Sequence, residues 1–406
     1  MPPANVTARP SPTQLSPARP REAPTASGAP GRPFARVEVF GAIEDAAAAW
    51  AELAQSAAAS SYQSFTFAKV WFATIGAAQG VSPLIVVARN DAGVPVALAP
   101  LALRQYGPLK LARFLGGKDA NFNLGFFRPD LNWSREDIEA LFREAGRRPN
   151  PRVDAFLLTN QPLQWRDKAN PLAEATRQPS PSFAYKSALP ADFAQWLDAH
   201  ASKDAKKKMR KKRARLEAIA PLTHGRAADP EAIALALAAF HDQRRARVAA
   251  LGLPDPYGSG AAQAFLERLA LEGALELHTM TLGERIIAVF GALAGVDRLS
   301  GLFVANDGDP EIARSSPGEL MIHAIVADAI ARGFREFDLG VGEARYKDES
   351  CEQIEALFDS AFAISLRGRL AASGFLAARR IKRVAKQSPR LTALYARLRR
   401  GRGAEV

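Results

Sequence analysis

Near the end of the sequence, residues 337–347 gather several groups that can transfer protons. The stretch reads Phe-Asp-Leu-Gly-Val-Gly-Glu-Ala-Arg-Tyr-Lys, and its titratable side chains include Asp338, Glu343, Tyr346 and Lys347. The apolar residues predict a strand over 336–339, and a helix is expected to follow it. Because open α/β sheets bind ligands beyond the carboxyl ends of their strands, these side chains are candidates for a functional site. The alternative is a polar loop over which Tyr346 packs.

A second candidate site is the loop Arg314-Ser-Ser-Pro-Gly318, which adjoins residues 316–331, where an apolar pattern predicts an amphipathic helix. Either serine can cap the helix, and the proline suits its first position. The glycine lets a ligand approach the backbone, and the free N–H groups of a helix N-terminus favour an anion such as a pyrophosphate. The predicted cofactor-binding residues are Arg314, Ser315, Ser316 and Gly318. The alternative is a plain capped helix without a ligand.

Several other motifs have simpler structural explanations. The Gly-Val-Gly at 340–342 does not predict a dinucleotide site, because Arg345 stands where that fingerprint requires Gly or Ala. The run Asn-Asp-Gly-Asp-Pro at 306–310 is typical of a turn rather than of a metal site. Cys351 has no histidine near it in the sequence, so we expect an inert thiol. His323 lies among apolar helix residues and is expected to serve the core or the helix face.

Two blocks of the sequence show the same order of predicted elements. In each block helices come first, followed by a strand hairpin, a third strand, a helix and a further strand. The hairpins are predicted over 83–103 and 275–295, and the helices after them over 134–145 and 316–331. A strand over 357–365 is expected to end the second block. We interpret the repeated order as an internal duplication that produces two mixed α/β domains.

Length and composition agree with this division. A chain of 406 residues is long enough for about two domains, and an apolar content of 48% excludes a mainly disordered protein. The single Cys excludes a disulfide framework and a multi-cysteine metal centre, and no metal site is predicted. The predicted parts are a disordered Pro-rich leader at 1–34, an N-terminal domain at 35–188, a C-terminal domain at 189–366 and a basic tail at 367–406. No clear phosphate loop occurs in the N-terminal domain, so we expect it to be degenerate.

The sequence resembles the CelD-like acyltransferases, which belong to the GCN5-related N-acetyltransferase (GNAT) superfamily. The resemblance rests on a basic helix over 203–216, a strand hairpin, Ser-Pro-Gly before a helix, and the Phe-Asp-Leu-Gly stretch that ends in Tyr346-Lys347. It covers about residues 35–370. The family is named for proteins of cellulose and exopolysaccharide formation and is similar to the Fem-type aminoacyltransferases. The resemblance implies an α/β (α+β mixed) fold of two tandem GNAT-like acyl-CoA N-acyltransferase folds.

The resemblance also implies the substrates. An acyl-CoA such as acetyl-CoA would be the co-substrate, with its phosphates at the start of the helix at 316–331 and no permanently bound cofactor. The loop departs from the superfamily pattern Arg/Gln-x-x-Gly-x-Gly/Ala, because its glycine comes one residue late and the second is missing. An aminoacyl-tRNA or another carrier therefore stays open as the donor.

Direct transfer is the mechanism that the resemblance implies. Tyr346 would protonate the leaving thiolate, and Glu343 or Asp338 would take the proton of the attacking amine or hydroxyl. Glu319 and His323 are second choices for this base. The residues predicted to bind the acceptor are Lys347, His241 and Arg244, of which the last two also suit a solvated helix face.

The net charge of +12 is unevenly distributed. Basic residues gather in the first 36 residues, in 203–215 and in 366–402, which together carry +24, so the remainder carries −12. This distribution makes a nucleic-acid partner unlikely as the general explanation of the charge. Leucines at helical spacing among the arginines of 390–400 predict contact with an anionic membrane surface, with a solvated tail as the alternative.

The predicted function is acyl transfer from acyl-CoA to a sugar or amine acceptor in extracellular or envelope polysaccharide biosynthesis. The alternatives are a non-catalytic accessory protein of a polysaccharide-synthesis complex and a Fem-like transferase that uses aminoacyl-tRNA. No apolar run is long enough for a membrane span or a secretory signal. We therefore expect a cytoplasmic protein with peripheral contact at the inner membrane.

Overall fold

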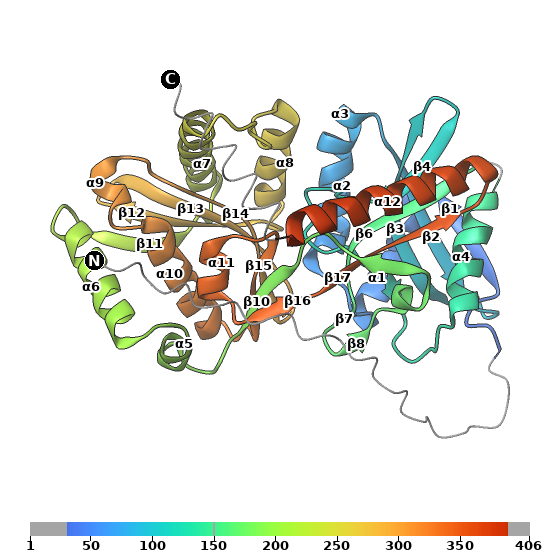
Figure 1. Ribbon diagram of the computed structural model, residues 1–406, viewed down its shortest axis with the longest axis horizontal. Helices are drawn as coiled ribbons and strands as arrows, with labels where there is room; N and C mark the ends of the chain where they lie inside the picture. The colour runs from blue at the N-terminus through green and yellow to red at the C-terminus, as the bar shows by residue number, and fades with distance from the viewer. Residues whose placement is uncertain (1–30, 149–150, 389–406) are drawn as a thin grey trace. The chain divides into compact units, whose positions relative to one another are not determined.

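The computed structural model describes residues 31–148 and 151–388 (Figure 1). Its helices and strands all belong to one compact unit that begins at Pro33. The predicted leader lies almost entirely outside the described residues. So does the part of the predicted tail from residue 389 onward, which contains the leucine pattern expected to contact membrane.

The first sheet contains most of the strands predicted in the first block. Its strand order is β1-β2-β3-β4-β6-β17-β9, with the short β5 paired to β3. All neighbours are antiparallel except β4 and β6, which are parallel. The bounds are β1 (Arg36–Phe40), β2 (Ser82–Arg89), β3 (Pro95–Tyr106), β4 (Leu109–Phe114), β5 (Phe126–Phe127), β6 (Ala155–Pro162), β9 (Arg177–Pro179) and β17 (Leu357–Ala363). The predicted hairpin over 83–103 is confirmed as β2 and β3.

The second sheet repeats this arrangement. Its order is β11-β12-β13-β14-β15-β10-β16, and its parallel pair is β14 and β15. The bounds are β10 (Ala184–Ala188), β11 (Leu222–Arg226), β12 (Glu276–Leu282), β13 (Arg285–Ala294), β14 (Arg298–Asn306), β15 (Glu336–Val341) and β16 (Gln353–Glu355). A separate short hairpin joins β7 (Gln164–Trp165) to β8 (Lys168–Ala169). The matching order confirms the predicted mixed α/β fold with two similar halves.

The two sheets exchange strands. Strand β17 follows the whole second sheet along the chain, yet it pairs with β6 and β9 of the first sheet. Strand β10 precedes the second block, yet it pairs with β15 and β16 of the second sheet. The strand at 357–365 therefore exists as predicted, but its expected place in the second block was wrong. The predicted boundary at 188/189 separates β10 from its own sheet.

Helices cover the sheets. They are α1 (Ala47–Ser56), α2 (Phe65–Trp71), α3 (Ala77–Gln79), α4 (Arg135–Arg147), α5 (Phe193–His200), α6 (Lys203–Glu217), α7 (Pro230–Ala250), α8 (Gly260–Leu271), α9 (Pro310–Ala313), α10 (Pro317–Ala331), α11 (Arg345–Ser350) and α12 (Leu366–Gln387). In the second half, α7 and α8 pack with Val289 on one face of β13, and α10 packs with Phe290 on the other. The alternation follows from the two-residue period of a strand.

Helix α12 begins where the sequence predicts a basic tail. It packs along β17 and β6, and Figure 1 shows it crossing this part of the first sheet. Its Gly368 lies against the backbone of Asp154, so closely that a Cβ atom would overlap the carbonyl. The first part of the predicted tail is therefore an ordered layer of the first half.

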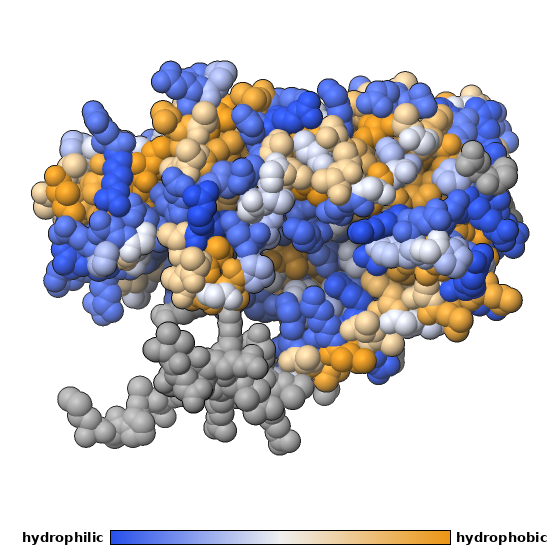
Figure 2. Space-filling model, turned by 90° about the horizontal axis from the view of Figure 1, so that it is seen from above, coloured by the Kyte–Doolittle hydropathy of each residue, from blue (hydrophilic) through white to orange (hydrophobic). Residues whose placement is uncertain are grey.

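Hydropathy does not single out a site on the face of the molecule that Figure 2 shows. On the face that Figure 2 shows, hydrophilic residues (blue) and hydrophobic residues (orange) lie side by side. Within the described ranges no helix is both long and apolar enough to cross a membrane.

Candidate active site

A cleft of about 1170 Å³ opens beside the carboxyl-terminal half of β14. Residues 302–306 of this strand form one wall, and the N-terminus of α10 lies next to them. Helices α6 and α7 supply further walls, α11 contributes Tyr346, and Lys118 and Asp119 come from a loop of the first half. The cleft thus collects residues from both halves of the chain at the ends of the parallel strands, where α/β sheets commonly bind ligands.

The parallel strands β14 and β15 separate along their length. They pair over three residues only, 298–300 against 336–338. Beyond these, Asn121 from the first half enters the gap and bridges the strands. Its Nδ2 donates to the carbonyl of Gly301 (3.1 Å), and its Oδ1 accepts from the N–H of Val341 (3.3 Å). Tyr62 supports the bridge, because its hydroxyl accepts from Asn121 Nδ2 (2.7 Å) and donates to the same carbonyl (3.3 Å).

The bridge explains one residue of the Phe-Asp-Leu-Gly motif. Gly340 has φ +72°, and a Cβ atom there would overlap the side chain of Asn121. Only glycine combines this backbone conformation with so close a neighbour. The sequence pointed to residues around Gly340, but no local pattern identified Asn121 as its partner across the two halves.

Tyr346 is the predicted catalytic residue that lies in the cleft. It stands on α11 with a relative exposure of 38%, directly after the end of β15. Partial burial raises the pKa of Tyr346, and the nearby Arg247 offsets only part of this effect. The phenol therefore stays protonated at neutral pH and can donate a proton to a ligand in the cleft.

The start of α10 also borders the cleft, through Ser316 and Gly318. Ser316 has a left-handed backbone (φ 52°, ψ 61°), a conformation that costs a non-glycine residue about 1 kcal/mol or more, and its side chain does not cap the helix. The first N–H groups of α10 are thus not covered by a cap. A Cβ atom at Gly318 would sit 3.4 Å from Asn306 Oδ1 in the cleft wall.

Two other residues of the predicted anion loop do not line the cleft. Arg314 is paired with Glu311 at 3.2 Å. Ser315 is fully buried, and its hydroxyl has no hydrogen-bond partner among the described residues. The loop therefore reaches the cleft through its second serine and its glycine.

Asp338 and Lys347 are buried close to each other, beneath the ends of the parallel strands. The Asp338 carboxylate accepts from Ser300 Oγ (2.6 Å) and from the N–H of Gly340 (3.0 Å), and burial raises its pKa to about 6. The Lys347 ammonium donates to the carbonyls of Gly340 (3.3 Å) and Val341 (3.1 Å), and burial lowers its pKa to about 8. Both side chains hold the backbone of β15 and neither lines the cleft.

The remaining predicted residues divide between the cleft and other surfaces. Arg244 lines the cleft, where it pairs with Asp255 (2.9 Å). His241 lies one helical turn earlier without lining it, and burial lowers the pKa of its imidazole. Glu343 is exposed and faces α12, with its carboxylate 3.5 Å from Lys386 Nζ. Ser316, Gly318, Arg244 and Tyr346 are therefore the predicted site residues that the fold brings together.

The cleft contains further charged residues that sequence reasoning did not assign to a site. Lys208 and Lys212 of α6 and Arg247 of α7 line it. The basic run at 203–215 was visible in the sequence, but only the packing of α6 shows which of its residues face the cleft. Lys212 also pairs with Glu319 at the start of α10. The walls around α10 are thus basic enough to attract an anionic ligand.

His323 is a cleft residue that can accept a proton. It lines the cleft on α10 and meets the ring of Trp196 edge-on at 5.4 Å. Burial lowers the pKa of its imidazole, so the ring is neutral at pH 7. Its buried Nδ1 has no hydrogen-bond partner among the described residues.

The single cysteine does not contribute a nucleophile. Cys351 is buried, and burial raises the pKa of its thiol to about 12, so that the thiolate is scarce at neutral pH. In residues 31–148 and 151–388, no group of three or more His, Cys, Asp or Glu side chains could hold a metal ion.

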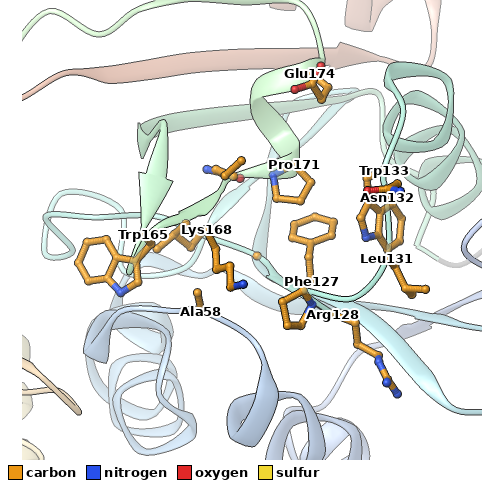
Figure 3. Close-up of a pocket in the computed structure, with 15 residues that line it drawn as sticks. Ala58, Phe127, Arg128, Leu131, Asn132, Trp133, Trp165, Lys168, Pro171 and Glu174 are labelled. Carbon is orange, nitrogen blue, oxygen red and sulfur yellow. The ribbon is translucent and has the colours of Figure 1, made fainter. Parts of the chain in front are cut away.

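A second, smaller pocket of about 290 Å³ lies in the first half (Figure 3). The rings of Phe127 and Trp133 gather around it, and Trp165 forms another wall. These rings already contact other side chains: Trp133 stacks on Phe34 (5.8 Å), and the guanidinium of Arg298 lies 3.9 Å over the ring of Trp165. None of the predicted site residues lines this pocket, so the cleft beside β14 is the candidate active site.

Comparisons with known proteins concern the same part of the chain. Residues 203–348, which supply most of the cleft, match the family described as "Acetyltransferase (GNAT) domain". No curated protein matches the sequence. Two solved structures are similar over most of both chains. A conserved protein of unknown function from Bacteroides thetaiotaomicron VPI-5482 is 10% identical, covers 80% of this chain and 100% of its own, and has a TM-score of 0.51. FemX is 11% identical, covers 82% of this chain and 98% of its own, and has a TM-score of 0.57.

At such identities the two structures establish the fold alone. The family match covers the basic helix, β14, the anion loop and Tyr346. Residues 203–348 are therefore similar to GNAT acetyltransferase domains.

Proposed function

We propose that the cleft beside β14 binds an acyl-CoA and transfers its acyl group to an amine or hydroxyl of a saccharide acceptor. The observation that carries this proposal is the convergence of Tyr346, the uncapped start of α10 and the basic residues of α6 on one cleft. Helix N-termini favour phosphate groups, and the lysines of α6 add positive charge beside them. The donor that suits such a wall carries phosphates at one end and a reactive acyl group at the other.

The reaction needs one proton removed and one supplied. The acceptor nitrogen or oxygen attacks the thioester carbonyl carbon, its proton passes to a base, and the carbon–sulfur bond breaks. Tyr346 gives its proton to the departing thiolate. Glu343 and Asp338 remain the predicted bases, but Glu319 and His323 line the cleft and are better situated for this role. The lowered pKa of His323 favours its neutral, proton-accepting form.

The acceptor class rests on the resemblance to the CelD-like acyltransferases. It suggests a sugar unit of an extracellular or envelope polysaccharide, modified in the cytoplasm before export. Arg244 and the nearby His241 stay candidates for the acceptor side, together with Lys347. On the donor side, Arg314 and Ser315 belong to the loop proposed to bind the phosphates.

A second candidate donor is an aminoacyl-tRNA. The specific observation in its favour is that Lys208 and Lys212 of the long basic helix α6 line the cleft. Their positive charge suits the phosphate backbone of an RNA. The absence of the second glycine from the loop at 314–319 points the same way. A third candidate, an accessory protein without turnover, predicts that the cleft has no catalytic activity.

Thermal unfolding with a panel of acyl-CoAs tests the donor. A ligand at one hundred times its Kd should stabilise the native protein by about 2.7 kcal/mol. Acyl transfer to aminosugars and short glycans, followed by mass spectrometry, tests the acceptor. No stabilisation by any acyl-CoA, together with salt-dependent binding of aminoacyl-tRNA, would favour the second donor.

Tyr346→Phe tests the proton donor. This variant should bind acyl-CoA like the wild type but turn over about a hundredfold or more slowly, because it lacks the acid. Tyr106→Phe is the matched control, because Tyr106 is similarly exposed (41%) and does not line the cleft. Equal turnover of Tyr346→Phe and the control would contradict the proposed role.

A further inference from the structure

One side of α12 presents large apolar side chains to solvent. Relative exposures are 76% for Leu366, 78% for Leu370, 70% for Ile381 and 59% for Val384. At the 3.6-residue repeat of a helix, the four fall within about 60° of one another, along a stripe of about 27 Å. The opposite side of α12 packs on β17 and β6, so the stripe faces away from the protein. We call it the α12 stripe.

Helix α12 is rich in basic residues. The helix contains seven of them and no acidic residue: Arg367, Arg369, Arg379, Arg380, Lys382, Arg383 and Lys386. Some of these bind inward, as when Arg379 pairs with Asp359 (2.5 Å) and Arg383 donates to the carbonyl of Ser180 (2.6 Å).

Other charges of α12 are left for an external partner. Arg369 and Arg380 are exposed and make no ion pair with any described residue. At the 3.6-residue repeat of a helix, both lie within about 60° of Leu366, so they flank the α12 stripe.

We propose that the α12 stripe docks on a bilayer that contains anionic phospholipids. Apolar side chains flanked by Lys and Arg let a helix lie in the membrane interface, and anionic lipid adds about 1 kcal/mol for each basic residue near the surface. The docking does not depend on the acyl-transfer reaction, because α12 contributes no residue to the cleft.

Other occupants fit the α12 stripe less well. RNA would meet the positive charge, but the four exposed apolar side chains are aliphatic and offer no aromatic ring for base stacking. A second copy of the chain would bring two strongly basic helices together, and their like charges would repel. A fluid anionic surface satisfies both the charge and the apolar side chains.

Co-sedimentation of the full chain with vesicles tests this docking. The chain should bind phosphatidylcholine vesicles that contain phosphatidylglycerol, bind pure phosphatidylcholine vesicles far more weakly, and dissociate in high salt. Arg369→Ala with Arg380→Ala should weaken binding about thirtyfold, since two basic residues are lost. Leu370→Ser with Ile381→Ser should weaken it about tenfold or more.

Val296→Ser is the matched control. Val296 is 82% exposed in the turn between β13 and β14, far along the chain from α12, and its loss should leave vesicle binding unchanged. A chain that ends at Ser388 should still bind, because it retains α12. Unchanged thermal unfolding will show that each variant is folded.

Four outcomes would overturn the proposal. They are equal binding of neutral and anionic vesicles, loss of binding in the chain that ends at Ser388, an RNA complex formed in place of vesicle binding, and a change of oligomeric state in the Leu370→Ser/Ile381→Ser variant.

Discussion

Burial changes the role that can be assigned to Asp338. In the sequence it is an acidic group at the end of a strand and a candidate base. In the fold it is fully buried, and both of its oxygens already accept hydrogen bonds from Ser300 and Gly340. These contacts make it a support for β14 and β15, whose separation borders the cleft.

The raised pKa of Asp338 predicts a pH-dependent stability. Its pKa is about 6 in the folded protein against 3.8 as the ordinary value, so the native state holds this proton between pH 4 and 6 more tightly than the unfolded state does. Its contribution to stability is therefore full below pH 4 and is lost as the pH rises through 6. By linkage the change amounts to about 3 kcal/mol.

Asp338→Asn isolates this effect, because Asn is neutral at every pH and keeps an acceptor for Gly340. The free energy of unfolding of the variant should gain about 3 kcal/mol relative to the wild type between pH 4 and pH 7. Urea unfolding at both pH values measures it. A stability difference between variant and wild type that does not change with pH would refute the raised pKa of Asp338. A loss of turnover without any change in stability would instead support Asp338 as the catalytic base.

At the scale of elements, the important feature is the pair β14 and β15. Two parallel strands that separate after three residues leave backbone groups unpaired, and buried unpaired groups are costly. Asn121 satisfies the carbonyl of Gly301 and the N–H of Val341 in one side chain. The first half thus holds the second half's strands at a defined spacing.

Asn121→Ala should therefore destabilise the protein by about 1 kcal/mol or more, since the N–H of Val341 loses its partner and the carbonyl of Gly301 keeps only the bond from Tyr62. We also expect a higher Kd for acyl-CoA, because β14 forms a wall of the cleft. Asn123→Ala is the matched control: Asn123 belongs to the same loop, but its side chain donates to the carbonyl of Thr159 within the first half (2.9 Å). It should lower stability without changing acyl-CoA binding. Equal effects of the two variants on binding would contradict the bridge.

At the scale of the whole molecule, the exchange of β10 and β17 joins the halves. Each sheet takes a strand from the part of the chain that forms the other. A shared core reinforces the union, as when Phe67 of the first half meets Phe265 of the second edge-on at 5.4 Å. Neither half completes its sheet alone.

Fragment complementation tests this interdependence. Residues 33–188 and 189–406, expressed together, should associate, because the first fragment contributes β10 and the second contributes β17. Residues 33–183 differ from 33–188 only in lacking β10, and they should form a much less stable complex with 189–406. Size-exclusion chromatography of the co-expressed pairs measures this. Equally stable complexes would mean that β10 is dispensable.

Much of the local structure was predictable because periodicity and turn residues act over short distances. The hairpins at 83–103 and 275–295, the helix at 316–331 and the strand at 336–339 all occur where the sequence places them. The motif around Tyr346 and the loop before α10 also led to the cleft.

Only the tertiary structure shows which strands pair and which side chains meet across the two halves. The alternation of apolar and polar residues in a strand predicts which face is buried but not which strand pairs with it. The sequences of β10 and β17 therefore did not predict that each pairs with the sheet of the other half. No sequence pattern near Asn121 predicts its contacts with Gly301 and Val341, which are about two hundred residues away in the sequence. Exposure likewise depends on distant neighbours, which is why Asp338 and Lys347 are buried outside the cleft while Lys208 and Lys212 line it. The sequence by itself determined the elements and the candidate chemistry, and long-range packing determined which groups share the cleft.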